Sequence, residues 1–350
     1  MKRVCFSIVF ILLFAFYTGN AQTPDNQALS TAAVHYRTAI DLLNAGRFVD
    51  ASMHLQHILN WFPDSEFAKP ALAINTLIYR LRVAPPADNR TYVIDSSYAG
   101  TVMELDEPLG LACDSQGNVY FTDKGKKSFM VFDPTGRQIK NSTLLSPYMV
   151  SANAGDMIYV GNDENVVAAD GKSVAFSIID SGGTLRPLED IRSIATDSKG
   201  RYYIISNKFP GILVYGQDRS PAKDFAPLQK QYYKVLVNSR DEICAVDKDR
   251  KQITIFDSTG KALSTIGPAG KGYTIEKIED FAVDEANNIY VLEKNPKSVL
   301  IFSSDGNILK YIQSDKKGTL AFEDARLLTV GPSGSIYILD KDSHRIMKIG

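Results

Sequence analysis

The feature of this sequence that most limits its possible folds is a pattern that recurs six times between residues 91 and 350. Each copy has an apolar strand segment, a polar turn, a second apolar segment that ends in a polar residue, and a further strand segment. The central residue of the second segment marks each copy, at positions 120, 159, 203, 244, 290 and 337. Adjacent markers are 39 to 47 residues apart, a spacing typical of β-propeller blades.

The copies align without gaps over the first strand and the turn that follows it. Six residues before each marker stands a residue suited to tight turns: Asp114, Asn153, Asp197, Asn238, Asp284 and Gly331. Nine residues before each marker stands an apolar residue that we expect to pack between blades: Leu111, Val150, Ile194, Val235, Phe281 and Leu328. The regularity predicts a mainly β protein with six blades.

Residues 91–350 resemble the NHL-repeat family of six-bladed β-propellers. Besides the aligned strands, the resemblance depends on acidic–Lys pairs after the second strands: Asp123-Lys124, Asp247-Lys248, Glu293-Lys294 and Asp340-Lys341. The family includes binding and scaffold proteins, RNA-binding propellers and relatives of metal-dependent lyases and lactonases. The resemblance therefore implies the fold and leaves the function open.

The last copy lacks a fourth strand before residue 350, whereas residues 91–94 have the character of a strand without a blade of their own. We expect this segment to pair with the last strand, residues 345–349. Such pairing closes the ring and removes exposed sheet edges.

The first residues have the pattern of an export signal. A basic start precedes an apolar run over residues 4–17, and small residues end at Ala21, which favours cleavage before Gln22. The run is shorter than the ~20 apolar residues of a membrane-spanning helix. We therefore expect residues 1–21 to be a signal peptide, and the mature protein to be periplasmic or secreted without a membrane span. An uncleaved anchor is the alternative.

Residues 27–84 predict a small helical module. Apolar residues recur at a spacing of three to four on both sides of Gly46, and Pro63 separates a third helical segment. The module resembles a tetratricopeptide repeat at Ala39, Gly46, Phe48, Ala51, Leu55 and Pro63. The resemblance implies either a docking or dimerising appendage or a peptide-binding groove.

Two further expectations concern this region. Trp61, the only Trp of the sequence, is expected to be a packing residue, with stacking on a ligand as the alternative. Residues 85–90 contain two prolines and are expected to link the helical module to the propeller.

Charge and histidine content exclude several functions. With 39 basic and 40 acidic side chains the formal net charge is −1, so we expect no nucleic-acid partner. Three of the four histidines lie in the helical module; His54 and His57 share a helical face, but no further ligand is evident near them. Because zinc sites need several converging ligands, we expect no metal and no cofactor.

Calcium, which prefers oxygen ligands, is the alternative at four equivalent carboxylates: Asp123, Asp247, Glu293 and Asp340. Turn capping is the simpler interpretation of these residues. Cys113 and Cys244 fall in the first and fourth blades, which lie opposite each other in a ring of six. That separation exceeds the reach of a disulfide, so we expect two free thiols.

The candidate binding residues begin the inner strands, at the expected mouth of the central channel. Eleven residues before the markers the set is not uniformly apolar: Leu109, Tyr148, Arg192, Tyr233, Glu279 and Arg326, with Lys234 and Asp280 adjacent. Tyr and Arg are enriched in interface hot spots. We therefore expect a binding site formed by Tyr148, Arg192, Tyr233, Lys234, Glu279, Asp280 and Arg326. The alternative is that these side chains plug the channel with ion pairs and stacked rings.

These observations favour an exported, non-enzymatic binding or scaffold protein that contacts a protein or peptide partner in the cell envelope through the propeller face and the helical module. The alternative is a propeller hydrolase or lyase, lactonase-like or lyase-like, with Ca²⁺ held by carboxylates. The oligomeric state is left open.

Overall fold

The computed structural model describes residues 26–83, 92–98, 103–153, 155–162, 165–168, 172–179, 184–222, 224–225, 230–270, 272–315 and 320–350, with only the backbone for residues 26–30. The expected signal peptide and the expected linker lie outside this part. The chain divides into two compact units, Met1–Pro85 and Pro86–Gly350. In the described part, no helix combines the length and the apolar character needed to cross a bilayer.

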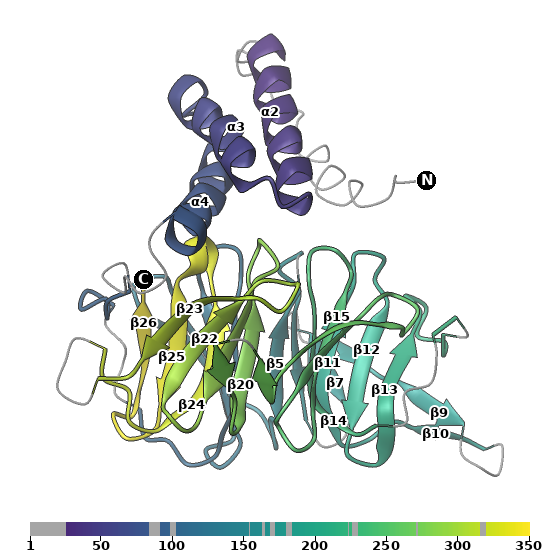
Figure 1. Ribbon diagram of the computed structural model, residues 1–350. Helices are drawn as coiled ribbons and strands as arrows, with labels where there is room; N and C mark the ends of the chain where they lie inside the picture. The colour runs from purple at the N-terminus through teal and green to yellow at the C-terminus, as the bar shows by residue number, and fades with distance from the viewer. Residues whose placement is uncertain are drawn as a thin grey trace. The chain divides into compact units, whose positions relative to one another are not determined.

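The first unit contains the three expected helices (Figure 1). They are α2 (Asn26–Asn44), α3 (Phe48–Trp61) and α4 (Ala68–Ile78), the last continued by one π-helical turn, η1 (Tyr79–Val83). Gly46 lies between α2 and α3 at φ +73°, a conformation that glycine adopts without steric cost. Ala39 and Ala51 are buried, which lets the two helices approach closely.

One expectation for this unit needs correction. Trp61 is not buried in the core: it is 70% exposed, and its ring centre lies 6.3 Å from that of His57. It follows Ile58, the last buried residue of α3. A third imidazole does lie beside His54 and His57. The Nδ1 atoms of His35 and His54 are 2.9 Å apart, and the His35 ring stacks on that of His57 with centroids 4.1 Å apart.

The second unit is a six-bladed β-propeller, which confirms the expected fold class (Figure 1). Blade one contains β1 (Pro108–Cys113), β2 (Val119–Asp123), β3 (Ser128–Phe132) and β4 (Gln138–Thr143). Blade two contains β5 (Met149–Ala152), β6 (Ile158–Gly161), β7 (Val166–Ala168) and β8 (Ser173–Val174). Blade three contains β11 (Ile191–Thr196), β12 (Tyr202–Ser206) and β13 (Phe209–Tyr215).

The other three blades follow the same antiparallel order. Blade four contains β14 (Tyr232–Val237), β15 (Ile243–Asp247), β16 (Ile253–Phe256) and β17 (Ala262–Ile266). Blade five contains β20 (Ile278–Val283), β21 (Ile289–Glu293), β22 (Ser298–Phe302) and β23 (Ile308–Gln313). Blade six contains β24 (Ala325–Val330), β25 (Ile336–Asp340) and β26 (Arg345–Ile349), with the short helix η2 (Pro332–Gly334) after β24.

Two small hairpins stand between blades: β9 (Ser177–Ile179) with β10 (Leu185–Pro187), and β18 (Ala269–Gly270) with β19 (Tyr273–Thr274). The first strand of every blade faces the centre, and β24 of the last blade lies beside β1 of the first. The apolar residues nine positions before the markers are all buried. Phe281 of β20, for example, packs against Cys244 and Val246 of blade four, so these residues join neighbouring blades as expected.

The ring closes where the sequence predicts it. Ile94 forms an antiparallel bridge with Ile349 of β26. The Asp95 N–H donates to the Lys348 carbonyl at 2.8 Å, and the Gly350 N–H donates to the Val93 carbonyl at 3.1 Å. Residues 92–95 therefore supply the outer edge of blade six, while Thr91 lies outside the described residues.

Candidate functional site

All seven expected binding residues line one cavity of about 350 Å³ where the inner strands begin: Tyr148, Arg192, Tyr233, Lys234, Glu279, Asp280 and Arg326. The volume is in the range of small-molecule pockets. Leu109, Arg250, Lys341, Asp106 and Glu107 also line it. The structure thus brings together seven expected residues that are up to 178 positions apart in the sequence, from Tyr148 to Arg326.

A β-bulge explains why these positions differ from the rest of each inner strand. In five blades the pairing register with the second strand skips one residue: Leu109, Arg192, Tyr233, Glu279 and Arg326. In the second blade Tyr148 directly precedes β5. A bulged residue has no partner in the ladder, and its side chain is aimed differently from its neighbours. The bulges therefore free these side chains from packing between blades.

The residue after each of three bulges connects its blade to the next one. Ser193 Oγ accepts a hydrogen bond from the Val235 N–H at 3.0 Å. Lys234 Nζ donates to the Phe281 carbonyl at 2.9 Å, and Asp280 Oδ2 accepts from the Leu328 N–H at 2.9 Å. Because inner strands of neighbouring blades share no ladder, these side chains satisfy backbone groups that would otherwise be buried without partners.

Lys234 and Asp280 also form an ion pair, with Nζ 2.6 Å from Oδ1. The Asp280 side chain is 4% exposed and that of Lys234 is 22% exposed. Their contacts with each other and with the backbone explain both side chains without a ligand. Their binding role stays a prediction.

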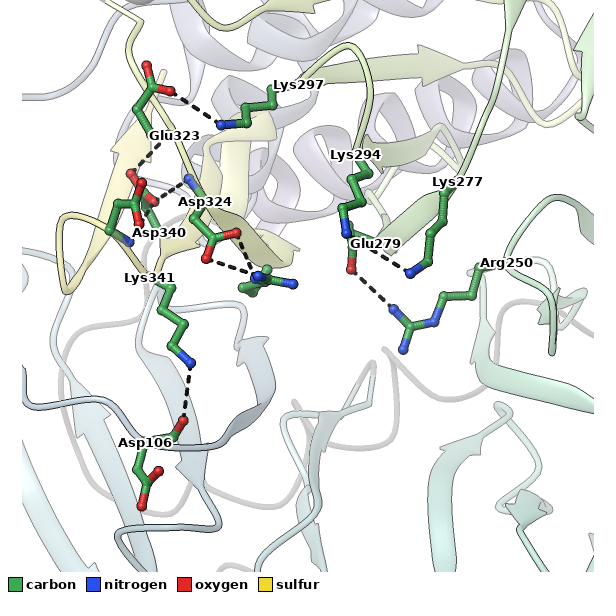
Figure 2. A network of polar contacts seen from close by, with 12 residues as sticks. Asp106, Arg250, Lys277, Glu279, Lys294, Lys297, Glu323, Asp324, Asp340 and Lys341 are labelled. Atoms are coloured by element: carbon green, nitrogen blue, oxygen red, sulfur yellow. Dashed lines mark hydrogen bonds and ion pairs between the residues drawn. The ribbon is translucent and has the colours of Figure 1, made fainter.

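Glu279 is surrounded by three basic side chains (Figure 2). Its Oε2 lies 3.1 Å from Arg250 Nη1, and its Oε1 lies 3.7 Å from Lys277 Nζ and 3.8 Å from Lys294 Nζ. Arg250 also places its guanidinium carbon 3.8 Å from the centre of the Tyr233 ring, a cation–π contact. Glu279 and Tyr233 together fix the position of Arg250 at the cavity.

Arg326 forms an ion pair with Asp324. Its Nη2 donates to Oδ2 at 3.0 Å, and its Nε lies 2.8 Å from Oδ1 but forms no hydrogen bond there. Lys341 donates to the Asp106 carbonyl at 3.4 Å, and Lys297 pairs with Glu323 at 3.3 Å, as Figure 2 shows. The alternative expectation was that the side chains at the mouth form ion pairs with one another. It holds in part, because Lys234 pairs with Asp280 and Arg250 pairs with Glu279.

Tyr148 is in contact with two cations. Lys124 Nζ lies 4.1 Å from the ring centre and donates to the phenol oxygen at 2.6 Å. The guanidinium carbon of Arg192 lies 4.4 Å from the same ring centre. Tyr148 and Tyr233 thus contact cationic side chains, and the arginines among them, Arg192 and Arg250, line the cavity.

Arg192 has a looser ion pair than Arg250 and Arg326. The nearest carboxylate oxygen, Oδ1 of Asp190, is 3.6 Å from Nε, beyond normal hydrogen-bond length. Within the described part of the chain the buried Nε has no hydrogen-bond partner. The guanidinium is therefore positioned by Tyr148 and has a loose ion pair with Asp190.

The expected set omits Arg250, Lys124 and Lys341, which contribute charge to the site. Each stands in the Lys- and Arg-rich turn after a second strand. Since second strands run antiparallel to the inner strands, these turns are at the same end of the blades as the bulges. The position of the turns was the available signal, but the sequence alone does not show which side chains bend toward the channel.

The four equivalent carboxylates cap turns, as the simpler interpretation predicts. Asp123 accepts hydrogen bonds from the N–H groups of Asp106, Glu107 and Lys126. Asp340 accepts from Glu323, Asp324 and Asp342, Asp247 from Lys251 and Gln252, and Glu293 from Glu276. Among described residues, no three His, Cys, Asp or Glu side chains are arranged to hold a metal ion. Cys113 and Cys244 are free thiols.

Comparisons with known proteins agree with this fold. A family model described as a 6-bladed beta-propeller matches residues 227–322. No curated protein sequence matches the chain.

Three solved structures are similar at low sequence identity. An auxiliary nutrient binding protein from Bacteroides ovatus is 14% identical, with a TM-score of 0.54 over 74% of this chain and 76% of its own. A gluconolactonase from Xanthomonas campestris is 14% identical, with a TM-score of 0.53 over 75% and 96%. A protein of unknown function from Bacteroides thetaiotaomicron is 11% identical, with a TM-score of 0.52 over 72% of each chain. At these identities the likeness extends to the fold alone: a six-bladed β-propeller, which in the described part of the chain follows the helices α2, α3 and α4.

Proposed function

We propose that this is an exported, non-enzymatic binding protein whose ligand or protein partner occupies the mouth of the propeller channel. The observation that carries the proposal is the cavity that Tyr148, Arg192, Tyr233 and Arg326 line together. Cation–π contacts and ion pairs already hold these side chains in place. Side chains ordered before binding lose less entropy when the complex forms, which suits a binding surface.

We further propose that the propeller is of the NHL-repeat kind and that α2 and α3 form one tetratricopeptide-like repeat with α4 packed beside it. Val49, Met53 and Trp61 of α3 are 72%, 64% and 70% exposed. Large exposed apolar side chains of this kind are typical of protein contacts. The helical unit then offers a second contact with a partner in the periplasm or outside the cell.

An enzyme is the second candidate, and the fold shared with the gluconolactonase favours it. Against it, the carboxylates that could hold Ca²⁺ have other partners: Asp123 and Asp340 each accept hydrogen bonds from three backbone N–H groups. Metal analysis of the purified protein separates the two candidates. A tightly held, stoichiometric divalent ion supports the enzyme, and its absence together with partner capture supports the binding protein.

The first prediction tests the channel mouth. Replacing Arg192 and Tyr233 with Ala should weaken capture of a cell-envelope partner by about 1 kcal/mol or more for each residue, the usual range for hot spots. Capture is measured by pull-down and titration with the mature protein. Both side chains are partly exposed, so the fold should persist.

Two controls accompany this measurement. Arg137→Ala removes an exposed arginine of the β3–β4 turn and should leave capture unchanged. Trp61→Ala reports on the helical unit. Unchanged capture in the Arg192/Tyr233 variant, with loss in Trp61→Ala, would move the site to the helices.

A further inference from the structure

The charges that line the mouth are nearly balanced, and most of them are paired. Five basic side chains line the cavity: Arg192, Lys234, Arg250, Arg326 and Lys341. Four acidic side chains line it: Asp106, Glu107, Glu279 and Asp280. The lining thus carries one net positive charge. Such a site suits a ligand with a single negative charge, because nearby carboxylates would repel a multiply charged one.

Of the lining cations that pair with a carboxylate, Arg192 has the longest ion pair, and Lys341 contacts the backbone carbonyl of Asp106 instead. Lys234, Arg250 and Arg326 lie 2.6, 3.1 and 2.8 Å from their carboxylates. Arg192 has only the 3.6 Å approach of Asp190. Among the residues that the structure describes, it donates no hydrogen bond from its buried Nε. This Nε is closed to solvent, so a ligand oxygen would meet the remainder of the Arg192 side chain, which is 36% exposed overall.

The planar shape of the Arg192 guanidinium further restricts the chemical group that the ligand can present. A guanidinium presents a planar fork of N–H donors that matches the two oxygens of a carboxylate. Tyr148 lies against the Arg192 guanidinium, 4.4 Å from ring centre to guanidinium carbon, which fixes the orientation of the fork. Arg192 is also a bulged residue of β11, so its side chain is directed out of the ladder at the cavity.

We propose that the channel mouth binds a carboxylate group and that Arg192 is the residue that receives it. The inference rests on the proposed binding function and names the chemistry of its ligand. The carboxylate belongs either to a small organic acid such as a sugar acid, for which 350 Å³ is ample, or to the end of a peptide chain.

The experiment is calorimetric titration of the mature full-length protein with four probes. D-glucuronate is compared with D-glucose, which has a similar ring and no charge. An acetylated tripeptide with a free C-terminal carboxylate is compared with the same tripeptide as the amide. We expect saturable binding of at least one charged probe and none of its neutral counterpart. Which charged probe binds identifies the source of the carboxylate.

Three variants test the role of Arg192. Arg192→Ala should weaken binding of the carboxylate probe at least about tenfold, as expected for hydrogen bonds to a charged group. Asp190→Asn removes the one carboxylate that competes for the guanidinium and should strengthen binding about twofold. Arg137→Ala, outside the cavity lining, should change nothing. Thermal midpoints of the variants establish that each is folded.

Two results would overturn the inference: no carboxylate probe binds, or binding is the same in Arg192→Ala as in the unaltered protein. Neither result by itself removes the proposed function. If the Arg192/Tyr233 variant loses partner capture while no carboxylate binds, the mouth is a binding site for a different chemistry. If partner capture does not depend on the mouth, the proposed function itself fails.

Discussion

Single residues in this protein explain the sequence pattern that marks the blades. In three blades the marker is a tyrosine whose hydroxyl donates to the aspartate six residues earlier. The distances are 2.8 Å for Tyr120 to Asp114, and 3.0 Å for both Tyr203 to Asp197 and Tyr290 to Asp284. Burial raises the pKa of Asp284, and hydrogen bonds from Asn288 and Tyr290 oppose that rise. Each aspartate also accepts turn N–H groups, so one carboxylate fixes the turn and orients the second strand.

The cysteines give a prediction at the same scale. Burial raises the pKa of the Cys244 thiol to about 12, and burial also raises the pKa of Cys113. At pH 8 both should be neutral thiols, and only the thiolate reacts rapidly. We expect slow alkylation by iodoacetamide in the folded protein and fast alkylation in guanidinium, followed by mass spectrometry. The exposed control Thr259→Cys should react at once; fast reaction of Cys244 under native conditions would contradict its burial.

At the scale of elements, side chains rather than ladders join one inner strand to the next. At the channel mouth the connections run through Ser193, Lys234 and Asp280. At the far end of the inner strands, backbone N–H groups donate to the next blade: Ser115 to Asp156, Ser198 to Asp241 and Ser239 to Asn287. These contacts fix the spacing of the blades at both ends of the channel, and therefore the width of the cavity.

Among these connecting residues, Asp280 contacts both Lys234 of blade four and the Leu328 N–H of blade six. Replacing it with Ala leaves Lys234 without its partner and the Leu328 N–H without an acceptor. Breaking a buried ion pair costs about 3–5 kcal/mol, so we expect a loss of that order in the unfolding free energy of the propeller, measured by urea denaturation. Asp305→Ala, at an exposed turn, should change it by less than about 0.5 kcal/mol. Equal effects of the two variants would contradict the connecting role.

At the scale of the whole molecule, residues 92–95 pair with β26 of blade six and so couple the beginning of the propeller to its end. Tyr92 is almost fully buried there, and Lys348 pairs with Asp95 at 3.3 Å. A closed ring has no free terminal blade that can separate first. Unfolding of the propeller should therefore be cooperative. Trp61, the only Trp, reports on the helical unit separately.

Deleting residues 92–95 should lower the thermal midpoint of the whole propeller by about 5 °C or more, since each kcal/mol shifts the midpoint by about 2–4 °C in a domain of this size. Tyrosine circular dichroism follows the propeller. Val93→Ala keeps the backbone carbonyl that accepts from Gly350 and should have little effect. An unchanged midpoint after the deletion, or an early transition limited to one blade, would show that closure does not couple the ends.

Much of the fold was predictable from the sequence because its determinants are local. Alternating apolar residues, the turn residues Asp114, Asp197 and Asp284, and the regular marker spacing specify strands and turns within each copy. The seam at residues 92–95 was predictable because the last copy lacks a strand. The seven residues of the mouth were predictable as positions, because the repeat aligns them at the same place in every blade.

Only the tertiary structure decided what those positions do. The bulges that free Arg192 and Tyr233, and the guanidinium groups of Arg192 and Arg250 on the rings of Tyr148 and Tyr233, depend on how strands pair and blades meet. The contact of His35 with His54 and the exposure of Trp61 likewise depend on how helices pack and end. A strand pattern specifies which face of a blade is buried, but pairing between side chains is set by distances that exist only after the ring has closed.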